Sequence, residues 1–278
     1  MRVLVTGSSG RIGAAICARL RSTHQVIGLD SRPGPATDVV GDILDADAMR
    51  HALRGVEAVV HTAALHAPHV GTYSDALFDA VNVQATGALA MLAVDEGIRR
   101  FVFTSTTALY GAGALPGAAA TWVDEDLAPN PLTIYHRSKL AAEALLETLA
   151  ARHDLSVTVL RMSRCFPEPV PLMAVYRLHR GIDARDVADA HALALERSVP
   201  GLHRYVISGE TPFVREDTEQ LGLDAPAVLR RRAPALVQAF AQRGWPLPAS
   251  IDRVYSPARA MRELGWQPRH GFTEVLAD

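Results

Sequence analysis

The protein has 278 residues, 49% of them hydrophobic, which is enough to bury a large core in one domain with a smaller appended region. Its 28 basic and 30 acidic residues leave a net charge of -2, which excludes the strongly basic surface of a nucleic-acid-binding or membrane-surface protein. No apolar run approaches the roughly 20 residues that span a bilayer, and two cysteines are too few for a disulfide framework. We therefore expect a soluble, cytoplasmic protein without a signal peptide.

The N-terminal stretch predicts a strand, a glycine-rich turn and a helix. An apolar run at 2–5 leads directly into the sequence TGSSGRIG at positions 6–13. Gly7 can take a positive φ, Gly10 lets the backbone approach a pyrophosphate, and Gly13 lets the helix lie close to the strand. The free N–H groups of the helix start favour an anion, so the turn predicts a dinucleotide site. A tight strand-to-helix turn that binds nothing is the alternative.

A second strand is expected at 26–30, and it ends in Asp30. This acid lies at the distance from the turn at which dinucleotide sites place a carboxylate that bonds the adenosine ribose. It favours NAD over NADP because a carboxylate repels a 2'-phosphate. Arg32, in the loop expected at 31–35, keeps NADP as an alternative because a guanidinium there accommodates the phosphate.

Further strands and helices alternate along the chain. Strands are expected at 39–43, 56–61, 101–104, 155–160 and 205–207, helices at 12–20, 45–53, 78–97, 133–152 and 185–196, and a Gly/Ala/Pro-rich loop at 111–120. This alternation predicts an α/β fold with a Rossmann-type, doubly wound parallel sheet. Ligands bind such sheets where the strands end, which is where the hydroxyl cluster 105–107 lies. His61 also ends a strand, and a satisfied structural histidine is as reasonable an interpretation of it as a cofactor contact.

A second motif, Tyr135-x-x-x-Lys139, falls on the helix expected at 133–152. Residues four apart share a helix face, so the two side chains can point into one cleft. A tyrosine that serves as a base near neutral pH needs its pKa lowered by about three units, or about 4 kcal/mol. The Lys139 ammonium and the positive charge of an oxidised nicotinamide are neighbours of the kind that lower it.

With these motifs, the chain resembles the extended short-chain dehydrogenases/reductases of the NAD-dependent epimerase/dehydratase family. The resemblance covers nearly the whole chain. It rests on the glycine-rich turn, Asp30, GDI at 41–43, HTAA at 61–64, VNV at 81–83, FTST at 103–106, Tyr135 with Lys139, LR at 160–161, DVA at 186–188 and RELGWQP at 262–268.

The resemblance implies roles for individual residues. Thr106 stands where the family keeps its catalytic Ser or Thr, with Tyr135 as the base and Lys139 on the nicotinamide ribose. The implied cofactor contacts are Gly7, Gly10, Arg11, Ile12, Gly13, Asp30, Ser31, Asp42, Ile43, Ala63, Ala64, Asn82, Thr104, Ser105, Tyr135, Lys139 and Met162. The implied substrate contacts are Thr106, Thr107 and Arg164, and no metal is expected.

Departures from the family pattern bear on the substrate. Only 167–185 separates the strand after Arg161 from the next helix, a segment too short to clamp a nucleotide as nucleotide-sugar members do. The segment 161–169 locally resembles uronate dehydrogenases. Arg164 stands where nucleotide-sugar members usually carry an asparagine, and a guanidinium there favours an anionic substrate. Pairing of Arg164 with Glu168, which would only shape the loop, is the alternative.

We therefore expect an NAD-dependent oxidoreductase that transfers hydride between the nicotinamide and a secondary hydroxyl of a small sugar, polyol or sugar acid. A sugar or nucleotide-sugar 4-epimerase and a non-catalytic dinucleotide-sensing regulator are the alternatives. Family dehydratases follow the catalytic Thr with an Asp-Glu pair, and because Thr107 and Ala108 stand there instead, a dehydratase is not expected. Residues 1–166 and 181–208 are expected to bind NAD, and residues 167–180 and 209–278 to form a small, partly helical substrate region. The family resemblance also predicts a homodimer through 78–97 and 133–152.

Overall fold

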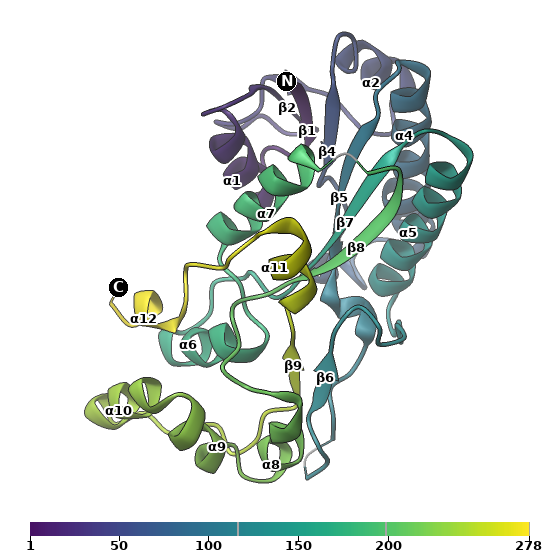
Figure 1. Ribbon diagram of the computed structural model, residues 1–278. Coiled ribbons are helices and arrows are strands. Elements are labelled where there is room, and N and C mark those ends of the chain that lie inside the picture. The colour runs from purple at the N-terminus through teal and green to yellow at the C-terminus, as the bar shows by residue number, and fades with distance from the viewer. Residues whose placement is uncertain (116, 198, 278) are drawn as a thin grey trace. The chain divides into compact units, whose positions relative to one another are not determined.

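Seven parallel strands form one sheet in the order β3-β2-β1-β4-β5-β7-β8 (Figure 1). The computed structural model describes residues 1–115, 117–197 and 199–277. The strands are β1 (Arg2–Thr6), β2 (Gln25–Asp30), β3 (Val39–Val40), β4 (Ala58–His61), β5 (Arg100–Thr106), β7 (Ser156–Met162) and β8 (Gly201–Ile207). The strand order reverses between β1 and β4, and at such a reversal the crevice beyond the carboxyl ends of the strands is the usual ligand site. The predicted Rossmann-type sheet is confirmed.

Helices cover both faces of this sheet (Figure 1). One face carries α1 (Arg11–Leu20) and α7 (Ala184–Glu196), which are joined by an ion pair between Arg19 and Asp189. The other carries α2 (Ala46–Ala52), α4 (Ala85–Asp95) and α5 (Ile134–Arg152). Apolar side chains of these three helices and of the strands beneath them form a continuous core. This core fixes where the carboxyl ends of the strands, and thus the candidate site, lie.

The helix expected at 78–97 differs from its prediction. It starts earlier, as α3 (Asp75–Asp79), and continues through a π-helical turn, η2 (Ala80–Gln84), into α4. Together these elements form a 21-residue helical stretch that contains an 18-residue window of mean hydropathy 1.5, long and apolar enough to cross a membrane by length and composition alone. Asp79, Asn82 and Gln84 interrupt this stretch, so it is not a continuous apolar run of the kind that the sequence was expected to lack. Leu89, Ala90 and Ala93 pack in the core, as expected of a core helix of a folded domain.

The strand expected at 39–43 is also shorter than predicted. Only Val39–Val40 pairs, with Leu29 and Asp30 of β2. Asp42 then forms a turn in which its carboxylate accepts a hydrogen bond from the Leu44 N–H at 3.0 Å. Such turns are typical of aspartate, which competes with strand pairing for the backbone.

The chain divides into two units. The first comprises Met1–Leu109, Pro131–Arg161 and Val187–Tyr205, and the second comprises Tyr110–Asn130, Met162–Asp186 and Val206–Asp278. The second unit holds a two-stranded parallel sheet and several short helices. These are β6 (Thr121–Val123), β9 (Arg253–Tyr255), α6 (Val170–His179), α8 (Thr218–Leu223), α9 (Ala225–Arg232), α10 (Pro234–Arg243), α11 (Ala258–Leu264) and α12 (Phe272–Val275).

The second unit has an apolar core of its own, which includes Phe213, Leu236, Phe240 and Val254. Short helical turns occur at η1 (Ala67–His69), η3 (Thr107–Tyr110) and η4 (Arg215–Asp217). Between η3 and β6, the loop predicted at 111–120 contains no helix or strand in its described residues, and Pro116 lies outside them. Asp278, the last residue of the predicted substrate region, also lies outside the described residues.

Candidate active site

The glycine-rich turn joins the end of β1 to α1. Gly7 has φ +76°, and a Cβ there would lie 2.7 Å from the Ala63 nitrogen. A Cβ on Gly13 would lie 2.1 Å from the Gly7 carbonyl oxygen, so only glycine allows this approach of helix to strand. Gly10 caps α1 without a side-chain hydrogen bond, and no acidic residue lies in the first turn. The turn therefore fits a pyrophosphate, because its N–H groups and helix dipole favour an anion.

Asp30 lies beside this turn. Its Oδ2 accepts a hydrogen bond from the Ser9 N–H at 3.0 Å, and its Oδ1 accepts one from the Arg32 N–H at 3.0 Å. The Ser9 hydroxyl donates to the Arg32 carbonyl at 2.6 Å, which ties the following loop to the turn. Ser31 and Arg32 are exposed. A carboxylate held at the end of β2 in this way retains acceptor capacity for the hydroxyls of a ribose.

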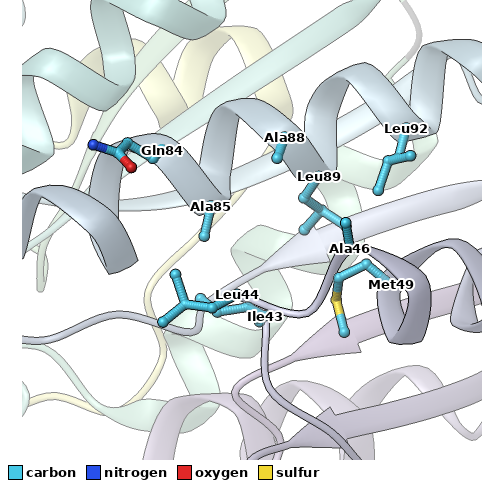
Figure 2. A pocket seen from close by; sticks show the side chains of 9 residues that line it. All are labelled: Ile43, Leu44, Ala46, Met49, Gln84, Ala85, Ala88, Leu89 and Leu92. Atoms are coloured by element: carbon cyan, nitrogen blue, oxygen red, sulfur yellow. The ribbon is translucent and has the colours of Figure 1, made fainter. Parts of the chain in front are cut away.

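A small cavity of about 160 Å³ lies between the segment after β3 and helix α4 (Figure 2). Ile43 and Leu44 line it from one side, and Ala85, Ala88 and Leu89 from the other. Ile43 is, with Asp42, one of the two residues for which the family resemblance implies an adenine contact. The cavity contains none of the residues implied in the chemistry.

Thr106, Tyr135 and Lys139 come from two adjacent elements, β5 and α5. Burial raises the pKa of Tyr135 above its usual value, against a smaller opposing effect of the neighbouring Thr106 side chain. The Lys139 ammonium lies 4.1 Å from the centre of the Phe103 ring, and burial lowers its pKa to about 7, against a smaller opposing effect of Glu143. The pKa of Tyr135 in the chain alone therefore stays above its usual value, and a base here depends on a further positive charge.

Three predicted cofactor residues have side chains that bond inside the protein. Thr104 Oγ1 lies 2.8 Å from His191 Nε2, Ser105 donates to Glu143 Oε1 at 2.5 Å, and Asn82 bonds the backbone of Leu65 and the Ser138 hydroxyl. All three side chains are buried. They position the strand and helix ends from inside the protein, while the main chain of Ala63 lies directly against the glycine-rich turn.

In the second unit, Met162 ends β7 and Arg164 follows it. Arg164 forms an ion pair with Glu168, with Nε 2.6 Å from Oε1. The guanidinium also lies 5.3 Å from the centre of the Phe166 ring. Its positive charge is thus compensated by a neighbouring carboxylate, which is the alternative that the sequence left open.

Thr107, the third residue of the hydroxyl cluster, is buried in η3.

Glu143 is a residue that sequence reasoning missed. It lies one helical turn after Lys139, and its carboxylate is fully buried. Arg161 donates to it through Nε at 3.1 Å and through Nη2 at 2.6 Å, and Arg204 donates at 3.2 Å. With the Ser105 hydroxyl, these donors tie α5 to β5, β7 and β8. The i, i+4 spacing from Lys139 and the motif residue Arg161 were the available signals, but the pairing itself joins distant parts of the chain.

Among residues 1–115, 117–197 and 199–277, no group of three or more His, Cys, Asp or Glu side chains is placed to hold a metal ion.

Comparisons with known proteins agree with this geometry. A model of the NAD dependent epimerase/dehydratase family matches residues 3–169, more than half of the chain. The L-arabinose 1-dehydrogenase (NAD(P)(+)) of Haloferax volcanii is 32% identical over 284 residues, which cover 99% of each protein. An uncharacterized protein of Sinorhizobium fredii is 34% identical over 164 residues. That alignment covers 57% of this chain and 39% of the relative, so the chain spans less than half of that relative's length.

Among solved structures, MoeE5 in complex with UDP-glucose and NAD has a TM-score of 0.74 and 25% sequence identity to this chain. The superposition covers 100% of this chain and 96% of that one.

The buried Glu143 cluster gives a prediction about stability. Replacing Glu143 with glutamine leaves two arginines facing a neutral side chain in the protein interior, so the free energy of unfolding should fall by about 3 kcal/mol. Glu147→Gln is the matched control, because that exposed carboxylate pairs with the same Arg204 and its loss should change stability by less than about 1 kcal/mol. Urea unfolding measures both. Equal effects of the two substitutions would contradict a special role for the buried carboxylate.

Proposed function

Because the chain belongs to the NAD-dependent epimerase/dehydratase family, we propose that it is an NAD-dependent oxidoreductase acting on a small sugar, polyol or sugar acid. The observation that carries the proposal is that the Thr106 side chain neighbours Tyr135, with Lys139 one helical turn away on the same face of α5. The L-arabinose 1-dehydrogenase, which aligns over 99% of both proteins at 32% identity, supports net oxidation, and a UDP-glucose 4-epimerase of Bacillus subtilis aligns over 100% of this chain and 95% of its own length at 25% identity.

In the proposed reaction Tyr135 accepts the proton of a secondary hydroxyl, and Thr106 holds the oxygen of that hydroxyl. When bound, NAD takes up the hydride from the same carbon at nicotinamide C4 and adds a positive charge to the site. Positive charge close to Tyr135 favours its phenolate, which offsets the effect of burial on the tyrosine pKa. Lys139 supplies such a charge in its protonated form, and its lowered pKa makes that form sensitive to pH near neutrality.

The residues that would hold NAD lie at the carboxyl edge of the sheet. The N–H groups at the start of α1 would face the pyrophosphate, Asp30 would accept from the adenosine ribose, and Ile43 would pack on the adenine. Lys139 would donate to the nicotinamide ribose. The glycine-rich turn is the feature of this chain that fits NAD. A Cβ at Gly7 or Gly13 would clash with neighbouring backbone atoms, so only glycine allows the turn to take this shape.

A 4-epimerase is the second candidate, supported by the family itself and by the likeness to a structure that holds UDP-glucose and NAD. The two activities differ in the fate of the cofactor. A dehydrogenase accumulates NADH with its sugar, whereas an epimerase returns the cofactor as NAD. A screen of neutral sugars, uronic acids and hydroxy acids with NAD, followed at the NADH absorbance, therefore decides between them. NAD binding with neither NADH formation nor epimerisation would favour the dinucleotide-sensing regulator.

The first prediction concerns the base. Tyr135→Phe should abolish turnover while the affinity for NAD stays nearly unchanged, because the substitution removes the titrating oxygen and keeps the ring. Rates of NADH formation and NAD titrations measure the two effects. The control is Tyr73→Phe, an exposed tyrosine that should tolerate the same change. Activity above a few per cent of wild type would exclude Tyr135 as the base.

The second prediction concerns cofactor choice. Asp30→Ala should weaken binding of NAD by about tenfold, or about 1.4 kcal/mol, and should weaken binding of NADP less. The physical reason is that the carboxylate bonds the ribose of NAD but repels the 2'-phosphate of NADP. Calorimetric titration with both cofactors measures the difference. An equal loss of affinity for both would mean that Asp30 acts only on the glycine-rich turn.

The third prediction tests whether Arg164 recognises an anionic substrate. If it does, Arg164→Met should raise the KM for a uronic acid by about tenfold and leave the KM for the matching neutral sugar unchanged. Glu168→Gln, which removes the competing carboxylate, should then lower the KM for the uronic acid. A uniform change for both substrates in Arg164→Met would assign Arg164 to the loop alone, as the ion pair with Glu168 suggests.

We also propose that the protein works in the cytoplasm as a homodimer through 78–97 and 133–152. Small exposed side chains on two helices that pack together, Ala88 of α4 with Ala141 and Ala144 of α5, would allow close approach of a second copy. Sedimentation at micromolar concentration should give a dimer. A monomer at all concentrations up to that range would exclude this assembly.

A further inference from the structure

A chain of buried hydrogen bonds begins at the glycine-rich turn and passes through His61. Thr6, the residue before Gly7, is the register partner of His61 at the ends of β1 and β4. Its Oγ1 lies 2.7 Å from His61 Nδ1 and also accepts a hydrogen bond from the Ala63 N–H at 3.3 Å. His61 Nε2 lies 2.9 Å from Thr86 Oγ1 in α4. His61 thus bridges the cofactor turn to the helix across the sheet.

The direction of these bonds follows from the number of protons. The Thr86 hydroxyl donates its one hydrogen bond to the Asn82 carbonyl, at 2.8 Å, and therefore accepts a hydrogen bond from His61 Nε2–H. His61 Nδ1 then carries no proton and accepts from the Thr6 hydroxyl. Burial lowers the pKa of His61 to about 3, with the charge of Lys139 acting in the same direction. The imidazole is therefore held neutral in a single tautomer, with each nitrogen assigned one role.

The chain continues to Tyr135 through the π-helical turn η2. The Asn82 side chain accepts from the Leu65 N–H at 2.8 Å and donates to the Leu65 carbonyl at 2.9 Å. It also donates to the Ser138 hydroxyl at 2.9 Å, and Ser138 donates to the Tyr135 carbonyl at 3.0 Å. The backbone of the proposed base is therefore linked, bond by bond, to the turn proposed to bind the pyrophosphate.

A second contact path reaches Lys139. The His61 ring stacks on Phe103 with a centroid distance of 5.8 Å, and the Lys139 ammonium lies 4.1 Å from the centre of the same Phe103 ring. A charged His61 would repel Lys139 across this short distance, whereas a neutral ring supports the aromatic face that the ammonium contacts.

We infer that His61 is a positioning residue for the proposed reaction: as a fixed donor-acceptor bridge, it sets the places of Tyr135 and Lys139 relative to the glycine-rich turn. The inference rests on the proposed function, since it concerns the geometry of that same site. A purely structural histidine would instead contribute to the stability of the core without affecting the chemistry of Tyr135.

The experiment compares His61→Ala with Val59→Ala, a fully buried substitution in the same strand that leaves the hydrogen-bond chain intact. Each variant is measured for thermal stability, for kcat and KM with NAD and a sugar, and for the phenol pKa of Tyr135. The last comes from ultraviolet difference titration of each variant with and without Tyr135→Phe, which needs no turnover.

Positioning predicts that His61→Ala lowers kcat by about tenfold or more beyond Val59→Ala, with KM changed less than about threefold. It also predicts that the phenol pKa of Tyr135 moves by about half a unit toward its ordinary value of about 10 in His61→Ala, but not in Val59→Ala. Equal kcat and equal phenol pKa in the two variants would overturn the inference.

Thr86 provides a second test should His61→Ala fail to fold. Thr86→Val removes the acceptor of the His61 Nε2–H bond at nearly constant shape, whereas Thr86→Ser keeps the hydroxyl. The inference expects Thr86→Val to behave as His61→Ala does and Thr86→Ser to restore wild-type values. Identical kcat and phenol pKa in both Thr86 variants would overturn it. Absence of any turnover in the wild type would contradict the proposed function, and the phenol titration would then decide the inference by itself.

Discussion

The candidate site depends most on the hydrogen bonds and ion pairs that the buried carboxylate of Glu143 receives. It lies on the same helix as Tyr135 and Lys139, and it receives hydrogen bonds from β5, β7 and β8 through Ser105, Arg161 and Arg204. A buried carboxylate without these donors would carry a large desolvation penalty, so helix α5 is stable in one orientation against the sheet. That orientation brings Tyr135 next to Thr106. The local chemistry therefore depends on an ion pair more than one helical turn away.

Features set by local sequence could be predicted, and features set by distant partners could not. The glycine-rich turn and the Tyr135–Lys139 spacing depend on backbone sterics and helix periodicity, which neighbouring residues encode. The π-helical turn at η2 was missed because Asn82 is held by the backbone of Leu65 and by Ser138, neither of which is close in sequence. Strands β6 and β9 were missed for the same reason, since each has three residues and the two pair across more than a hundred positions. The cofactor and substrate contacts predicted for individual residues stay predictions.

The side chains of the site alone do not make Tyr135 a base, and the proposed cofactor would add the positive charge that does. Burial raises the pKa of Tyr135 and lowers that of Lys139, so each group is held closer to its neutral form than in water. A neutral tyrosine beside a lysine that titrates near pH 7 is a poor base by itself. A site with this balance becomes basic only when positive charge is added to it. The same arrangement would keep Tyr135 protonated until an oxidised dinucleotide is present, which limits unproductive proton transfer.

The carboxylate proposed to set the cofactor preference is also preorganised within the first unit. Both oxygens of Asp30 accept backbone N–H groups, one from the glycine-rich turn and one from the loop that follows β2. Ser9 closes this arrangement from the other side through the Arg32 carbonyl, while Thr37 Oγ1 lies 2.8 Å from the Ser9 hydroxyl. The carboxylate is therefore fixed before any ribose arrives, and little side-chain entropy remains to be lost on binding. Because the bonds that fix Asp30 also fix the turn, the proposed ribose and pyrophosphate subsites form as one rigid element. A substitution in either subsite should therefore alter the geometry of both.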